Sequence, residues 1–85
     1  MRITVVGLGY VGLASAMILS QHNKVIGLDT SIEKINQLKE KNSPIEDADI
    51  EEFLHKNTIN FKPTANREDA LKSAEIVIIS TPTNY

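Results

Sequence analysis

The chain has 85 residues, of which 41% are hydrophobic, and nine basic side chains against eleven acidic ones give it a formal net charge of −2. This size supports one small domain with a modest core. The slight acidity and the lack of a polybasic stretch argue against nucleic acid or an anionic membrane as a partner, and the absence of cysteine excludes disulfides, a thiolate nucleophile and a cysteine-based metal site from these residues.

The first residues predict a strand that leads into a turn and a helix. Residues 2–6 (RITVV) form an apolar, β-branched run, as expected of a strand covered on both faces. The GLGYVG that follows at residues 7–12 matches G-x-G-x-x-G. A segment of helical periodicity opens there and extends over residues 10–21. Its inward positions are expected to be Val11, Ala14, Ile18 and Leu19.

Each glycine of this motif has its own physical task in a nucleotide-binding βαβ unit. Gly7 permits the tight turn after the strand, and Gly12 lets the helix pack closely on the strand. Gly9 has no side chain to keep a diphosphate away from the backbone. The N–H groups of the first helical turn, at the positive end of the helix dipole, would then hold the phosphates.

An acidic residue follows the glycine motif at the spacing expected of a dinucleotide site. Residues 24–28 (KVIGL) predict the second strand, which ends at Asp29, 22 residues after Gly7. Dinucleotide sites place an acidic residue about 20 residues on, to accept hydrogen bonds from the ribose of the adenosine. No arginine adjoins Asp29 in the sequence, and its charge would repel a 2′-phosphate, so NAD is favoured over NADP. Asp29 could also cap the next helix, and both roles can coexist.

The middle of the chain predicts two helices and a weaker strand. A capping-box pattern at residues 30–33 starts a helix whose expected inward residues are Ile32, Ile35 and Leu38. A turn at residues 43–46, a possible second capping box, precedes a short helix over residues 47–56. The expected inward residues of that helix are Ile50, Phe53 and Leu54. The weaker strand is predicted over residues 58–62.

The last part of the chain predicts a turn, a short helix and a strand. The turn spans residues 63–66, and Asn66 is the expected N-cap for a helix over residues 67–73. Residues 75–79 (EIVII) form the clearest buried strand, and they run into the loop at 80–85.

The predicted order is β-α-β-α-α-β-α-β, which indicates an α/β protein with a partial Rossmann (doubly wound) fold: about four parallel strands with crossover helices. Such a fold has six strands, so we expect residues 1–85 to be the N-terminal part of an NAD-binding domain, a fragment of a longer protein. The sequence shows no secretory signal and no apolar run near the roughly 20 residues of a membrane span, and we expect a cytoplasmic protein.

Few other residues carry a chemical signal. Lys34 is either a solvated lysine or a residue that leans toward the adenosine. The hydroxyls of residues 80–83 would border the cofactor crevice or simply end a strand. His22 and His55 lack partners at metal-ligand spacing, and no grouping of side chains suggests a nucleophile with its base. We therefore expect no metal site and no catalytic residue in this chain.

Three blocks together resemble the UDP-glucose/GDP-mannose dehydrogenase family: GLGYVGL at 7–13, SPIED at 43–47 and TPTNY at 81–85. The resemblance implies an oxidoreductase that converts the C6 hydroxyl of a nucleotide sugar, by closest resemblance UDP-glucose, to a carboxylate while two NAD are reduced. It also implies that the family's catalytic cysteine and UDP-binding domain lie beyond Tyr85, and that the whole protein is a homo-oligomer. The fragment alone is expected to be inactive.

The resemblance also assigns site residues. Val11 would donate backbone hydrogen bonds to the diphosphate, Asp29 and Lys34 would contact the ribose region, and Thr83 would contact the cofactor from the last strand end. The expected cofactor-binding residues are Gly7, Gly9, Tyr10, Val11, Gly12, Asp29, Lys34, Thr81 and Thr83. Three alternatives stay open: another nucleotide-sugar dehydrogenase of the family, a non-catalytic NAD-sensing module, and an S-adenosylmethionine-dependent methyltransferase, which also uses a glycine-rich first loop and an acidic second-strand end.

Overall fold

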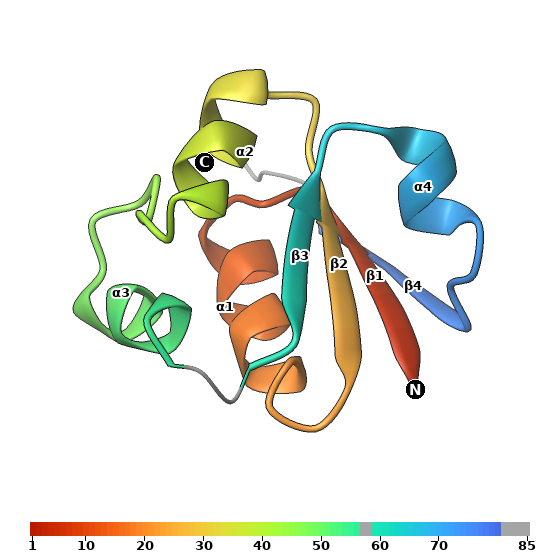
Figure 1. Ribbon diagram of the computed structural model, residues 1–85, viewed down its shortest axis with the longest axis horizontal. Coiled ribbons are helices and arrows are strands. Elements are labelled where there is room, and N and C mark those ends of the chain that lie inside the picture. The colour runs from red at the N-terminus through yellow and green to blue at the C-terminus, as the bar shows by residue number, and fades with distance from the viewer. Residues whose placement is uncertain (57–58, 81–85) are drawn as a thin grey trace.

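The computed structural model describes residues 1–56 and 59–80, and their elements follow the predicted order (Figure 1). The strands are β1 (Arg2–Val6), β2 (Lys24–Leu28), β3 (Phe61–Thr64) and β4 (Ile76–Ile79). The helices are α1 (Tyr10–Leu19), α2 (Ile32–Lys39), α3 (Ala48–Leu54) and α4 (Arg67–Leu71). No helix in the described ranges is long and apolar enough to cross a membrane.

The four strands form one parallel sheet in the order β3-β2-β1-β4. In Figure 1, α1, α2 and α3 cover one face of this sheet and α4 covers the other. The switch of face follows from the topology, because the chain steps outward from β1 to β3 and then returns past β1 to β4, and right-handed crossovers in opposite directions lie on opposite faces. This confirms the predicted partial Rossmann fold.

The core lies between the sheet and the helices of the α1 face. Ile3 and Val5 of β1 belong to it, together with Leu13 and Met17 of α1. Thr4, between the two core residues of β1, points the other way, and its hydroxyl donates to the carbonyl of Ala70 in α4. This alternation is the strand period of two, applied to a strand covered on both faces. Each fully buried large apolar side chain stabilises the fold by about 1.5–3 kcal/mol.

Helix α1 buries a different face from the predicted one. Leu13, Ala16 and Met17 are fully buried, whereas Val11 and Ile18 are 68% and 59% exposed. The prediction was wrong for these two residues because the sequence of α1, YVGLASAMIL, is apolar on every side. In such a helix the hydrophobic pattern does not single out a face.

Helix α2 fits its prediction in part. Its residues Ile35 and Leu38 are buried as expected, but Ile32, at its first position, is 62% exposed. Ser31, not Thr30, is its N-cap, and its hydroxyl oxygen accepts the N–H of Lys34.

The other two helices are also capped by short polar side chains. Asp47 caps α3 by accepting the N–H groups of Asp49 and Ile50, so the predicted second capping box at residues 43–46 is not formed. Asn66 caps α4, as predicted. Each such cap contributes about 0.5–2 kcal/mol.

Strand β3 lies three residues later than predicted and includes Pro63. The N–H of Val25 donates to the carbonyl of Asn60, and that of Asp29 donates to the carbonyl of Thr64. Because backbone groups alternate in direction along a strand, the nitrogen of Pro63 faces away from β2. At an edge strand proline removes no ladder hydrogen bond, so the predicted turn at Pro63 was wrong.

Strand β4 is formed as predicted, but the prediction that it is buried is wrong. It lies at the edge of the sheet next to β1. Ile78 packs on the core, whereas Val77 and Ile79 are 46% and 71% exposed. An apolar run implies burial only where other elements cover both faces of the strand, and among the described residues such cover is incomplete.

Candidate functional site

The glycine turn lies at the carboxyl edge of the sheet, where β1 and β2 end at the same level. Val6 is paired with Leu28 in the register of these strands. The turn is fastened to β2 twice, since the N–H of Gly7 donates to the carbonyl of Leu28 at 2.8 Å and that of Leu8 donates to a carboxylate oxygen of Asp29 at 2.9 Å. The side chain of Leu8 is fully buried beneath the turn. The turn is thus held in one position by backbone bonds and packing.

Two of the three glycines are required by the fold itself. Gly7 has φ +93°, and a Cβ there would lie 2.0 Å from the carbonyl oxygen of Ser80. A Cβ on Gly12 would lie 1.9 Å from the carbonyl oxygen of Gly7. No real Cβ approaches so closely, so Gly12 allows α1 to pack directly on the turn, as the sequence predicted.

Gly9 is different, because the fold does not require it. An added Cβ would meet no atom of the described residues within 4 Å, and the φ of −73° and ψ of −168° are open to any residue. Gly9 is the N-cap of α1 and makes no side-chain cap bond. The first three N–H groups of the helix, those of Tyr10, Val11 and Gly12, therefore have no acceptor among the described residues. A bare backbone beside unpaired donors is the arrangement that an anion needs.

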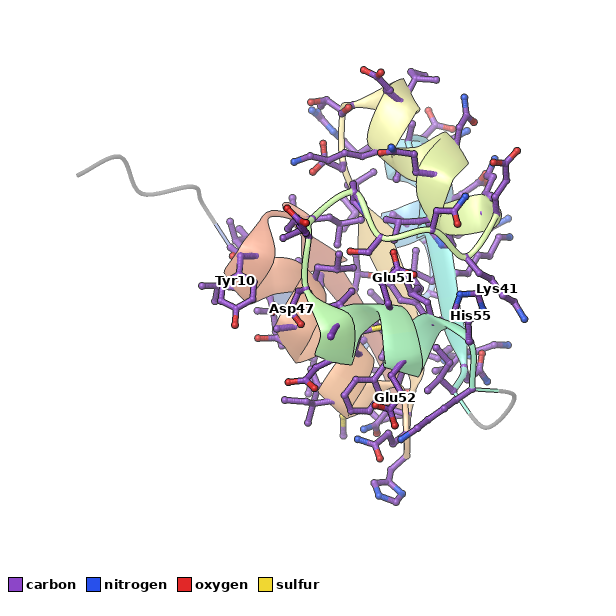
Figure 2. All side chains as sticks on the ribbon, turned by 90° about the vertical axis from the view of Figure 1, so that its left-hand side faces the viewer. Tyr10, Lys41, Asp47, Glu51, Glu52 and His55 are labelled. Atoms are coloured by element: carbon purple, nitrogen blue, oxygen red, sulfur yellow. The ribbon has the colours of Figure 1, made fainter. Side chains whose placement is uncertain are left out.

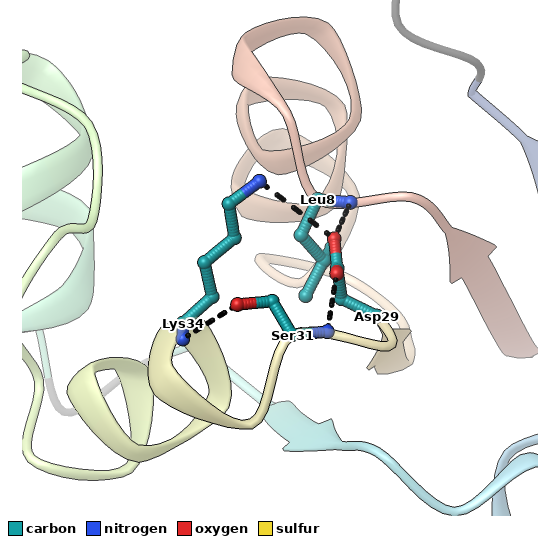
Figure 3. Close-up of polar contacts among 4 residues, drawn as sticks. All are labelled: Leu8, Asp29, Ser31 and Lys34. Atoms are coloured by element: carbon teal, nitrogen blue, oxygen red, sulfur yellow. Dashed lines mark hydrogen bonds and ion pairs between the residues drawn. The ribbon is translucent and has the colours of Figure 1, made fainter.

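Asp29 stands beside this turn and forms a small network (Figure 3). One of its carboxylate oxygens accepts the N–H of Leu8, and the other accepts the N–H of Ser31 at 2.9 Å. The side chain of Asp29 is only 14% exposed. It therefore joins the glycine turn to Ser31, the N-cap of α2; the alternative prediction that Asp29 itself caps this helix is wrong, because Ser31 holds that position. Since a carboxylate has about four acceptor positions, Asp29 can still accept hydroxyl groups of a ligand.

Lys34 reaches the same carboxylate from the first turn of α2. Its Nζ lies 3.9 Å from Oδ2 of Asp29, and its side chain is 37% exposed (Figure 3). The ion pair is long and partly solvated, so it contributes little to stability. It does hold the ammonium group at the rim of the site, on the side predicted for the adenosine.

One cleft is lined by the glycine turn, Asp29 and Lys34. Its volume of about 500 Å³ is within the usual range for small-molecule sites. Arg67, the first residue of α4, lines it as well. No arginine is next to Asp29 in the sequence, as stated above, but Arg67 lines the same cleft in space. It belongs to α4, on the other face of the sheet. Only the position of Arg67 shortly after a strand end could have indicated it.

The remaining predicted residues are placed as follows. Tyr10 is 58% exposed, and its side chain lines a groove between α1 and α3 together with Asp47 and Phe53 (Figure 2). The exposed side chain of Val11 leaves its backbone N–H as the group available to a ligand. Thr81 and Thr83 lie outside the described residues.

The site fits a dinucleotide. Within the described ranges it combines a helix N-terminus whose first donors have no acceptor, a glycine that leaves the backbone bare, and a carboxylate at the end of the second strand, where dinucleotide sites hold a ribose. These features define the class as a Rossmann-type dinucleotide-binding domain.

Comparison with known proteins then gives the family. The model of the UDP-glucose/GDP-mannose dehydrogenase family, NAD binding domain, matches residues 1–85, and the chain belongs to this family. It is 38% identical, over its whole length, to UDP-glucose 6-dehydrogenase of Streptococcus pneumoniae and covers 22% of that protein. It is 37% identical to UDP-N-acetyl-D-mannosamine dehydrogenase of Methanococcus vannielii, where the match covers 96% of this chain and 19% of the relative.

A solved structure of a GDP-mannose dehydrogenase has the same fold. GDP-mannose dehydrogenase from Pseudomonas aeruginosa matches with a TM-score of 0.90 and 33% identity, over 99% of this chain and 20% of that one. The chain thus spans about a fifth of the length of the relatives that it matches. It is an NAD-binding domain of a family of NAD-dependent oxidoreductases, and NAD is its cofactor.

Proposed function

We propose that residues 1–85 are the N-terminal part of the NAD-binding domain of a UDP-glucose 6-dehydrogenase, and that the full-length protein oxidises UDP-glucose to UDP-glucuronate with two NAD as acceptors. The observation that carries the binding part is Gly9: no contact within residues 1–56 and 59–80 requires a glycine there, and it stands beside three N–H groups that have no acceptor in those ranges. The choice of sugar is supported by the 38% identity with the pneumococcal enzyme over the whole chain.

Each part of the site would perform one binding task. The N–H groups of Tyr10, Val11 and Gly12 would donate to the diphosphate, and the positive end of the α1 dipole would favour its negative charge. Asp29 would accept the ribose hydroxyls, and Lys34 would offset the charge of Asp29 and contact the same ribose. Bound NAD supplies the hydride acceptor, and the chain's contribution is to hold it in one orientation.

The cofactor part is tested by titrating the full-length protein with NAD, NADP and S-adenosylmethionine. We expect NAD to bind most tightly, since Asp29 disfavours a 2′-phosphate; preferred binding of S-adenosylmethionine would overturn the proposal. Replacing Asp29 with Ala is expected to weaken NAD binding by about 1–3 kcal/mol, the usual cost of losing a charged hydrogen bond. Unchanged affinity would remove Asp29 from the cofactor site.

The substrate part needs a separate assay. The rate at which the full-length protein forms NADH is measured with UDP-glucose, GDP-mannose and UDP-N-acetylmannosamine as alternative substrates. The highest kcat/KM is expected for UDP-glucose, and a preference for either of the others would reassign the sugar while leaving the family intact. A protein that binds NAD and oxidises none of the three would favour the sensing module. The proposal includes a cytoplasmic location and a homo-oligomeric protein, tested by fractionation and sedimentation.

A further inference from the structure

The cleft has a wall that the dinucleotide motif does not account for. Beyond the glycine turn and Asp29, it is lined by Ala65 and Arg67, which belong to the turn after β3 and to the start of α4. Helix α4 covers the opposite face of the sheet from α1 and α2 (Figure 1). Arg67 therefore meets the cleft from the side opposite to Lys34, and the two cations flank the cleft.

The two cations differ in their partners. Lys34 forms an ion pair with Asp29, whereas Arg67 has no ion-pair partner within residues 1–56 and 59–80. Arg67 is exposed, and its guanidinium group is thus available to a ligand. A structural role for Arg67 has no support in the described contacts, because α4 is capped by Asn66 and anchored through Ala70.

The order of the strands assigns this wall to one part of the dinucleotide. Along the carboxyl edge, α1 begins after β1, Asp29 follows β2, and Ala65 follows β3. Neighbouring strands are about 4.8 Å apart, so each step outward moves the site by one such spacing. With the diphosphate at α1 and the ribose at Asp29, the next group outward is the base.

We propose that Arg67 forms the adenine wall of the cleft, with its planar guanidinium group stacked on the base of the bound dinucleotide. This inference rests on the proposed cofactor site. A guanidinium group stacks well on aromatic faces, whereas an ammonium group is compact and strongly hydrated. Arg67 then adds affinity for the adenosine half of the cofactor and leaves the ribose bonds to Asp29.

The test measures the dissociation constants of NAD, AMP and NADP by isothermal titration of the full-length protein. Arg67→Ala is expected to weaken NAD and AMP by the same factor, about three- to tenfold, because both ligands carry the adenine. Arg67→Tyr keeps a flat surface and is expected to restore affinity to within about twofold, whereas Arg67→Lys keeps only the charge and should behave like Arg67→Ala. Lys72→Ala is the control, since it removes one positive charge from the other end of α4, away from the cleft.

Three outcomes would overturn the inference. Unchanged NAD affinity in Arg67→Ala would show that Arg67 does not contact the cofactor. Full affinity in Arg67→Lys would show that only its charge matters. A much larger loss for NADP than for NAD would assign Arg67 to a 2′-phosphate. Asp29→Ala, measured in parallel, separates these results from failure of the cofactor site: if it loses NAD while Arg67→Ala does not, only the role of Arg67 is refuted.

Discussion

Replacing Gly9 with Ala separates the needs of the fold from those of the cofactor. The added methyl group meets no atom within 4 Å in the part of the chain that the structure describes, and the backbone conformation suits alanine. Alanine is a poorer N-cap than glycine by about 0.5–1 kcal/mol. It also lowers the conformational entropy of the unfolded chain, which stabilises the folded state by about 0.4–1 kcal/mol. These effects oppose each other, so the free energy of unfolding is expected to change by less than about 1 kcal/mol.

The affinity for NAD, in contrast, is expected to fall in Gly9→Ala. The methyl group occupies the space through which a diphosphate approaches the first turn of α1. Losing one charge-assisted hydrogen bond costs about 1.5–3 kcal/mol, so NAD should bind roughly ten- to a hundredfold more weakly. The matched control is Gly12→Ala, whose Cβ would lie 1.9 Å from the carbonyl oxygen of Gly7 and must displace α1. That variant is expected to lose stability as well as NAD.

Thermal unfolding and isothermal titration of the two variants give the answer. Gly9→Ala should unfold near the temperature of the parent and bind NAD weakly, while Gly12→Ala should unfold at a clearly lower temperature. If Gly9→Ala binds NAD as the parent does, the diphosphate does not lie at this turn. If it unfolds as easily as Gly12→Ala, the account of its packing is wrong.

Three further predictions concern the structure around the site. Met17→Ala removes a fully buried side chain of α1 and should lower the free energy of unfolding by about 2–5 kcal/mol, measured by urea denaturation. Asp47→Ala removes the cap of α3 and should cost about 0.5–2 kcal/mol in the same assay without changing NAD affinity, since α3 lies away from the cleft; an equal loss of NAD affinity would contradict this separation. Ile18→Lys replaces an exposed apolar residue of α1, and a loss above about 1 kcal/mol would show that this face of α1 is covered in the full-length protein.

The site was predictable where its signal is local. Gly7, Gly9 and Gly12 occur within six residues, and Asp29 falls at the end of the next strand. Parallel strands bring these ends to one edge of the sheet, so the spacing alone predicts that the turn and the carboxylate meet. The structure adds how they meet, through the bond from the N–H of Leu8 to Asp29. It also divides the glycines into two that the fold requires and one, Gly9, that it does not.

The wrong predictions share a cause. The apolar pattern predicts that Val11 and Ile18 face inward and that residues 75–79 are buried, but such a pattern does not show which element lies opposite. Pro63 predicts a turn because the sequence does not show that β3 is an edge strand of the described sheet. Each of these outcomes depends on the neighbours of a segment in space.

The sequence by itself therefore determined the order of elements, the parallel fold, the position of the glycine turn and the carboxylate that accompanies it. Each of these rests on short spacings and on the two periods of strand and helix. Tertiary structure alone decided which faces are covered, and it brought Arg67 to the cleft from the far side of the sheet, 38 residues after Asp29. Packing between segments that are distant in the chain sets these features. The sequence does not predict them, because contacts of that kind produce no periodic pattern in it.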